Sequence, residues 1–398
     1  MIIKLDLYQT VAMAVLVFYI GSVLKKRVSL FEKYCIPSPV VGGILFALLT
    51  LLLNVTGLMT IETDDTMRNV FMTLFFTSVG YTASLKLLKK GGIQVIVFVL
   101  LCTVLVILQN VVGVSLATFF KLKPILGLCV GSIPMIGGHG TAGSIGTMLE
   151  NMGVSGAATV SVASATFGLI MGGMIGGPIA KKLISKNNLS STAVISKDGI
   201  DDFTEERLDD EPNFEQMLKA FSMLFLAAGI GSIISKLIQK TGITFPSYIG
   251  AMLAAAFLRN VSDVTRKFSI MEDIIGILGS VSLTLFLSMA LMGLKLWELA
   301  ELALPLVVML IAQTVLMILF SYFITYNVMG RDYEAAVMSS ACCGFGMGAT
   351  PNAIANMQAI TSKYGPAPKA YFIVPLVGSL FIDFINASII TIFINWLL

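Results

Sequence analysis

Two segments of the chain with a single charged residue each, 124–150 and 333–362, carry the residues best suited to bind a ligand through backbone atoms. Each is interrupted near its middle by glycine, with proline nearby. The first contains seven glycines and Pro134, and the second contains Gly344, Gly346, Gly348 and Pro351. Glycine permits positive φ angles and a close approach of the backbone to a ligand. Both segments therefore predict a hairpin whose tip presents main-chain N–H and C=O groups.

The second of these segments predicts a new helix just after its tip. Thr350 suits the N-cap and Pro351 suits the first helical position. Asn352 and Asn356 follow on one face of that helix, because they are four residues apart. We therefore expect a helix N-terminus with two amide side chains close to it.

The first segment predicts a similar helix start, with Thr141 or Ser144 as the cap. Each helix N-terminus carries about half a positive charge and unpaired N–H groups. Two such termini suit an anion without any lysine or arginine, and none lies in the middle of an apolar segment. The alternative is close packing through small residues. We favour packing for one glycine series only: Gly168, Gly172 and Gly176.

Asp383 is the single acidic residue deep inside an apolar segment, with Asn386 one helical turn later. Ionisable residues at membrane depth are usually functional. Asp383 could hold the ammonium group of an amino acid, bind Na⁺ together with carbonyl oxygens, or carry a proton. It could also be a hydrogen-bond acceptor for a neighbouring helix.

His139 is the only histidine and lies at the first predicted tip. It could contact a carboxylate or sense pH, but Met347 takes its place in the second segment, so its role stays open. Gln109-Asn110 and Gln313-Thr314 occupy similar positions in two other segments and could bind ligand or bond helices together. No metal-binding cluster or paired nucleophile and base is recognisable, so we expect a protein that is not an enzyme and needs no cofactor.

The composition of the chain explains where these residues must lie. The 398 residues are 56% hydrophobic and 12% charged, whereas soluble domains average about 25% charged residues. Residues 181–218 contain 14 of the 49 charges, which leaves uncharged stretches long enough to cross a membrane. The pattern predicts an all-α integral membrane protein and argues against nucleic-acid binding.

The apolar stretches predict ten membrane spans. They lie near 7–24, 36–56, 67–85, 92–120, 157–180, 215–237, 244–260, 275–297, 303–329 and 370–396. Several motifs recur 208 to 211 residues later; Gly138, for example, corresponds to Gly346. We therefore expect an N-terminal repeat (1–183), an acidic cytoplasmic linker (184–213) and a C-terminal repeat (214–398). Each repeat has five spans and one re-entrant hairpin, so the second is inverted relative to the first.

The distribution of basic residues predicts the orientation of the protein. With the N-terminus outside and both hairpins returning to their side of origin, 19 of the 26 lysines and arginines lie inside. Both termini are then outside and the central linker is cytoplasmic. The seven basic residues left outside are Lys4, Arg68, Lys121, Lys123, Lys236, Lys240 and Lys295.

Three motifs resemble those of the bacterial sodium/glutamate symporter family, and the resemblance extends over essentially the whole chain. They are Gly137-Gly138-His139-Gly140-Thr141, the run from Gly344 to Thr361, and the run from Leu291 to Leu299. The resemblance implies Na⁺-driven uptake of L-glutamate by a homodimer in the bacterial inner membrane. It also implies an elevator-type mechanism, in which a mobile domain carries both hairpins past a fixed scaffold. The alternatives are a related di- or tricarboxylate transporter coupled to Na⁺ or H⁺, and an anion-selective channel.

The expected substrate site combines backbone N–H groups with a few polar side chains. Its residues are Gly138, His139, Gly140, Thr141, Gly346, Gly348, Thr350, Asn352, Asn356, Asp383 and Asn386. For Na⁺ we expect Asp383 with carbonyl oxygens at the hairpin tips, from Gly137 and Gly344. The partners are thus glutamate, Na⁺, the lipid bilayer and a second copy of the chain.

Overall fold

The computed structural model describes residues 2–29, 31, 36–86, 92–191, 213–241, 247–266, 268–294, 296 and 303–398. The linker positions 192–212 and most of 295–302 lie outside these described residues. A described helix coincides with every predicted span. The helices are α1 (Leu7–Arg27), α3 (Ser38–Val55), α4 (Thr66–Thr82), α6 (Gly92–Phe119), α9 (Ala157–Asn187), α10 (Phe214–Gln239), α11 (Ser247–Thr265), α12 (Glu272–Met292), α13 (Ala303–Leu319) and the pair α17 (Pro368–Leu380) and α18 (Ile382–Leu397).

These helices confirm that the chain is a membrane protein. Among the described residues, seven helices are long and apolar enough to cross a bilayer, the last of them running from α13 through the π-helical turn η4 (Phe320–Thr325) to α14 (Tyr326–Val328). The bent pair α17–α18 makes an eighth. Helix α4 has 17 residues, and α11 carries Arg259 and Asp263. The prediction that all ten segments cross the membrane stays a prediction.

Two features differ from the predicted arrangement of unbroken helices. Strand β1 (Ile2–Lys4) pairs in parallel with β2 (Thr60–Glu62), and Lys4 Nζ lies 3.1 Å from Glu62 Oε2. The predicted single span 370–396 is broken, with a bend of 42° between Pro368–Gly378 and Ile382–Leu397. Pro375 lies inside α17, where it removes a main-chain hydrogen bond, and Gly378 follows at the break.

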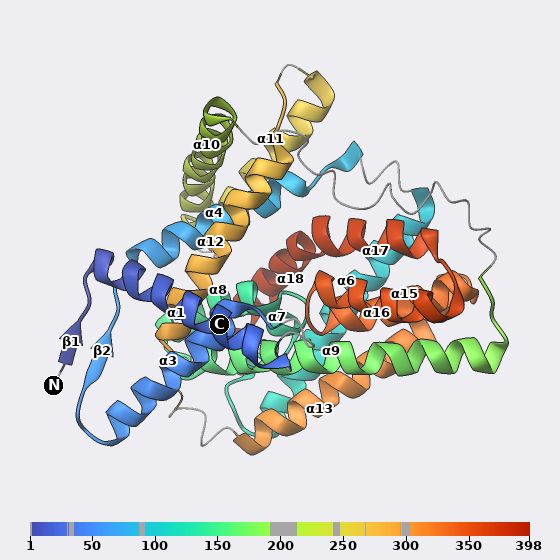
Figure 1. The fold of residues 1–398 in the computed structure, drawn as a ribbon, viewed down its shortest axis with the longest axis horizontal. Helices are drawn as coiled ribbons and strands as arrows, with labels where there is room; N and C mark the ends of the chain where they lie inside the picture. Colours follow the sequence, from blue (N-terminus) through green and yellow to red (C-terminus); the bar gives the residue numbers. More distant parts are fainter. Residues whose placement is uncertain are drawn as a thin grey trace.

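The helices form two groups (Figure 1). The first, called the lateral group here, consists of α1, α3, α4, α10, α11 and α12; α10 and α11 pack together, and α4 packs on α11 and α12. It contains two hydrophobic clusters of its own, one around Leu74 and Tyr81 and one around Val17 and Phe46. The hairpin group comprises α6, both broken segments, α9, α13, α17 and α18. The two groups meet mainly where α8 packs on α12.

Candidate functional site

Both glycine-rich segments break where the glycines predict. The first consists of a 3-10 turn η1 (Pro124–Gly127), α7 (Ser132–Met135) and α8 (Gly138–Asn151). The second consists of α15 (Tyr333–Gly346) and α16 (Thr350–Tyr364). The two are unequal, because a turn and one short helix precede the first break whereas a full helix precedes the second. Gly127 and Gly131 explain the irregular part, since it lies directly against Gly113 and Asn110 of α6.

The two breaks meet each other. Gly138 has a φ of 56°, and a methyl group built on it would lie 3.0 Å from the carbonyl oxygen of Gly348. Beside this contact, the Met347 carbonyl lies directly on Gly168, and Gly348 lies against Leu169 of α9. A positive φ and a close approach are both possible because these positions are glycine. The predicted tips therefore converge on the middle of α9.

The helix starts at the breaks lack the side-chain caps that the sequence predicts. The N-cap of α8 is Gly137 and that of α16 is Ala349, and neither start has a side-chain cap hydrogen bond. Thr350 is the first residue of α16 and not its cap. Its hydroxyl donates to the Gly378 carbonyl at 3.1 Å. The predictions of Thr350, Thr141 or Ser144 as caps are wrong. First-turn N–H groups are consequently left for a ligand or solvent.

Thr141 and Ser144 both lie inside α8, where the Ser144 hydroxyl donates to the Thr141 carbonyl at 3.1 Å. Gly140 also lies inside α8 and faces the ring of Phe75 on α4. The start of α8 is thus placed between the second break and the lateral group.

Asn352 and Asn356 attach α16 to α9. The amide of Asn352 donates to the Leu169 carbonyl at 2.6 Å, and that of Asn356 donates to the carbonyls of Gly172 (3.0 Å) and Ser340 (3.1 Å). Both side chains are buried. The glycine series on α9 consists of Gly168, Gly172 and Gly176. A methyl group at any of them would overlap the second broken segment, as expected if these glycines serve close helix packing.

His139 points toward α9. Its Nε2 atom lies 3.0 Å from Thr166 Oγ1, and the Thr166 hydroxyl itself donates to the Val162 carbonyl at 3.1 Å. Which of the two atoms donates depends on the tautomer of His139. The contact attaches the start of α8 to α9.

Asp383 lies in the first turn of α18, directly after the bend. It is partly buried, and its carboxylate makes no hydrogen bond or ion pair to another described residue. One turn later the amide of Asn386 donates to the Ser132 carbonyl at 3.1 Å, while its Oδ1 atom is buried without a partner in the described part of the chain. Together with the Thr350–Gly378 bond, this places the α17–α18 break between the two broken segments.

Gln109 also contacts the second break. Its Nε2 donates to the Gly346 carbonyl at 2.7 Å, and Gln313 Nε2 donates to the Gln109 carbonyl at 2.8 Å. Both side chains are fully buried, so they join α6, α13 and α15. Ser132 is a residue of this region that the sequence did not predict. The repeat could have identified it, because Ser340 follows Ser132 at the repeat offset of 208 residues.

The carbonyl oxygens expected to bind Na⁺ already accept one backbone bond each. Thr141 N donates to Gly137 O at 3.2 Å, and Ala349 N donates to Gly344 O at 3.2 Å. A carbonyl oxygen has a second lone pair, so each can still bind a cation. The described residues contain no group of three or more His, Cys, Asp or Glu side chains that could hold a metal ion.

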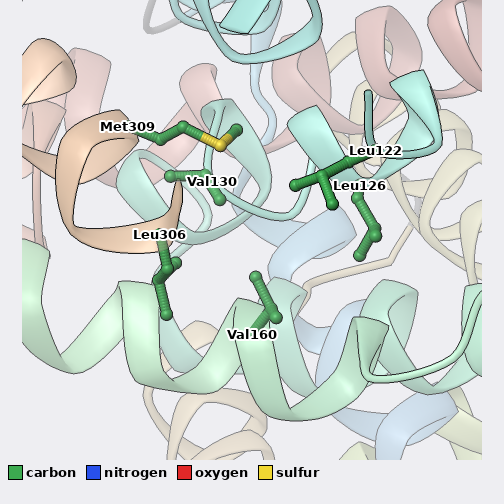
Figure 2. Close-up of a pocket in the computed structure, with 6 residues that line it drawn as sticks. All are labelled: Leu122, Leu126, Val130, Val160, Leu306 and Met309. Atoms are coloured by element: carbon green, nitrogen blue, oxygen red, sulfur yellow. The ribbon is translucent and has the colours of Figure 1, made fainter. Parts of the chain in front are cut away.

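A small pocket lies beside the part of the first broken segment that precedes its break (Figure 2). Apolar side chains line it: Leu122, Leu126, Val130, Val160, Leu306 and Met309. None of the candidate site residues is among them. A charged ligand would find no polar side chain there, so this pocket is not the candidate site.

Thr350→Val tests the bond between α16 and the α17–α18 break. Valine keeps the shape of threonine but cannot donate to Gly378 O, so unfolding should require about 0.5–1.5 kcal/mol less free energy. Thr391→Val in α18 is the matched control, because that hydroxyl bonds only to Ala387 O one turn earlier. Thermal unfolding in detergent measures both. Equal effects of the two variants would contradict a specific role for the Thr350 contact.

Comparison with known proteins places the chain among transporters. The family model described as sodium/glutamate symporter matches residues 3–366. The sodium/glutamate symporter of Escherichia coli (strain K12) is 38% identical over 398 residues, which is 98% of each chain. The protein of the same name from Haemophilus influenzae is 37% identical over 390 residues, or 96% of each chain. Asp383 and Asn386 lie beyond the range of the family model.

Proposed function

The chain belongs to the sodium/glutamate symporter family, and on that premise we propose that it imports L-glutamate together with Na⁺ across a bacterial inner membrane. The convergence of two uncapped helix starts, at Gly138 and Thr350, carries this proposal, because Gly138 lies against the Gly348 carbonyl just before the second start. Backbone N–H groups at such starts bind carboxylates, and glutamate has two. Discontinuous helices are the usual binding sites of secondary transporters.

The polar groups around the breaks complete the proposed site. The N–H groups of Gly138, His139 and Gly140 on one side, and those of Gly348 and Thr350 on the other, would bind the two carboxylates, because those of Thr141, Ala349 and Asn352 already donate to backbone carbonyls. Asp383 would receive the ammonium group or Na⁺, because it is the one acid in α18 and has no partner among the described residues. Carbonyls of Gly137 and Gly344 would contribute to Na⁺ binding. Asn386 would add its unpaired Oδ1.

An elevator-type movement is supported by the division into two helix groups. Both broken segments belong to the hairpin group, and its main contact with the lateral group is α8 on α12. Gly143 lies against Phe286 and Ala290 at this contact. On the α8 side this contact is made by two glycines, Gly140 and Gly143, which have no side chains to interlock with α12, so one group could slide past the other. We propose that the lateral group is the fixed scaffold.

Two glycine pairs support the inverted repeat. Gly21 of α1 and Gly42 of α3 leave no room for a side chain between these helices, and Gly231 of α10 and Gly250 of α11 do the same. The second pair follows the first by 210 and 208 residues. This matches the offset of the sequence motifs. Both termini outside, a cytoplasmic linker and a homodimer complete the proposal.

Uptake by proteoliposomes under different ion gradients tests the function. Radiolabelled L-glutamate should accumulate above its outside concentration with an inward Na⁺ gradient and not with K⁺ or H⁺ gradients; Li⁺ reports how narrow the selectivity is. Uptake indifferent to Na⁺ would contradict coupling. Flux that only equilibrates would indicate a channel. Malate or citrate competing better than glutamate would indicate a transporter of other carboxylates.

A further inference from the structure

A second cavity lies in the lateral group, at the ends of α4, α11 and α12. None of its lining residues belongs to the broken segments. Its volume is about 540 Å³, within the size range of small-molecule sites. Most of its lining side chains are charged or polar, among them Lys86, Arg259, Asp263, Arg266, Ser269 and Glu272. None of these residues takes part in the proposed transport site.

The floor of this cavity is held by a hydrogen-bonded network. Arg259 is 7% exposed and is paired with both Asp263 and Glu272. The Ser84 hydroxyl donates to Asp263, and the Asn260 amide donates to the Ala83 carbonyl at 2.8 Å. These bonds join the end of α4 to α11 and α12. The floor of the cavity is therefore preorganised by these bonds.

The rim of the cavity has an excess of positive charge. Lys86 and Arg266 are exposed, and neither forms an ion pair within the described residues. Lys219 of α10 adds a further cation, with Nζ 3.5 Å from the Ser269 hydroxyl. The two carboxylates of the cavity are already engaged by Arg259. An anion at the rim would thus meet two cations, Lys86 and Arg266, that no carboxylate of the described residues engages.

The surroundings of the cavity are apolar. Phe268 and Ile270 contribute to its wall, and Val264 and Phe257 on α11 are 83% and 69% exposed. The ends of membrane helices lie at the interface between lipid and water, and the basic residues predict that this end is cytoplasmic. A soluble anion would gain nothing from exposed apolar side chains, whereas a phospholipid could cover them with its acyl chains.

We infer that this cavity binds the phosphate headgroup of an anionic phospholipid, with Lys86 and Arg266 as the phosphate ligands and acyl chains along the exposed face of α11. Basic pockets on the cytoplasmic side of membrane helices bind such headgroups. The network around Arg259 joins the ends of α4 and α11, and the two cations follow these helix ends in the sequence. Ser269 is placed to donate a hydrogen bond to a phosphate oxygen.

Titration of the purified full-length protein with phosphatidylglycerol, followed by native mass spectrometry, tests this site. We expect tighter binding of phosphatidylglycerol than of phosphatidylcholine. The double variant Lys86→Gln/Arg266→Gln should weaken phosphatidylglycerol binding roughly 25-fold, at about fivefold for each cation. Lys236→Gln/Lys240→Gln is the matched control, because it removes two exposed lysines at the opposite end of α10 and should leave binding unchanged.

Two results would overturn the assignment. One is equal weakening by the two double variants, which would mean that only overall charge matters. The other is complete displacement of phosphatidylglycerol by inorganic phosphate at matching concentration, which would identify a site for soluble anions. Both exposed cations can be replaced without disturbing the buried network, so the thermal unfolding of the variant without anionic lipid should equal that of the wild type.

Discussion

Asp383→Asn should abolish Na⁺-driven accumulation of glutamate while the protein keeps or gains stability. Asparagine has the same shape but no charge, so the ammonium group or Na⁺ loses its counter-ion. Loss of one charged hydrogen bond costs about 1.5–3 kcal/mol, or roughly 10- to 100-fold in affinity. The free energy of unfolding should instead stay equal or rise, because a partly buried carboxylate without a hydrogen-bond partner among the described residues is costly to desolvate.

The measurements for this variant are uptake in proteoliposomes and thermal unfolding of the same preparation. Asp273→Asn is the matched control, since Asp273 also lies in the first turn of a helix, α12, but is exposed. Wild-type uptake by Asp383→Asn would remove Asp383 from the site. A marked loss of stability would support the other interpretation, in which Asp383 is a structural acceptor.

Gly168→Ala should displace the second break and impair transport, whereas Gly177→Ala on the same helix should not. A methyl group on Gly168 would overlap the Met347 carbonyl, while one on Gly177 would meet nothing within 4 Å. Overpacking costs about 1–3 kcal/mol, and alanine in an exposed helix is favoured over glycine by about 1 kcal/mol. We expect the first variant to unfold at lower temperature and bind glutamate at least about fivefold more weakly.

Equilibrium binding of glutamate and thermal unfolding separate the possible outcomes for this pair. Reduced stability with normal binding would show that the contact between α9 and Met347 is purely structural. Equal behaviour of Gly168→Ala and Gly177→Ala would contradict the close approach itself. The two variants share the substitution and the helix, so differences in expression or helix propensity do not explain a divergence.

The sequence predicts much of this fold because apolar length and glycine placement are local signals. Helices follow the predicted spans, and both breaks occur at the glycines, since the backbone there needs freedom that other residues lack. The caps were wrong because the Thr350 hydroxyl can either accept a bond from a first-turn N–H group as a cap or donate to a carbonyl of another helix, and its bond to Gly378 O depends on how α17 lies against α16. The bend after Gly378 was missed because hydropathy does not register a change of direction.

The candidate site shows a similar limit. Composition and spacing place Asp383 at depth but do not reveal that Asn352 and Asn356 donate to carbonyls of α9. Such contacts join residues more than 180 positions apart, so no local pattern reports them. The repeat offset is the exception, because it relates distant positions directly, as Ser132 and Ser340 illustrate.

The uncapped helix starts at Gly137 and Ala349 have a consequence for how such a transporter would evolve. A ligand bound by main-chain N–H groups is insensitive to most changes of side chain, because every residue except proline supplies the same donor. Sequence drift at the breaks would leave carboxylate binding intact as long as the backbone path is kept. A lineage could then acquire a different acidic substrate by altering only the few side chains around the ends of the ligand, with His139 and Asp383 as the first positions to vary.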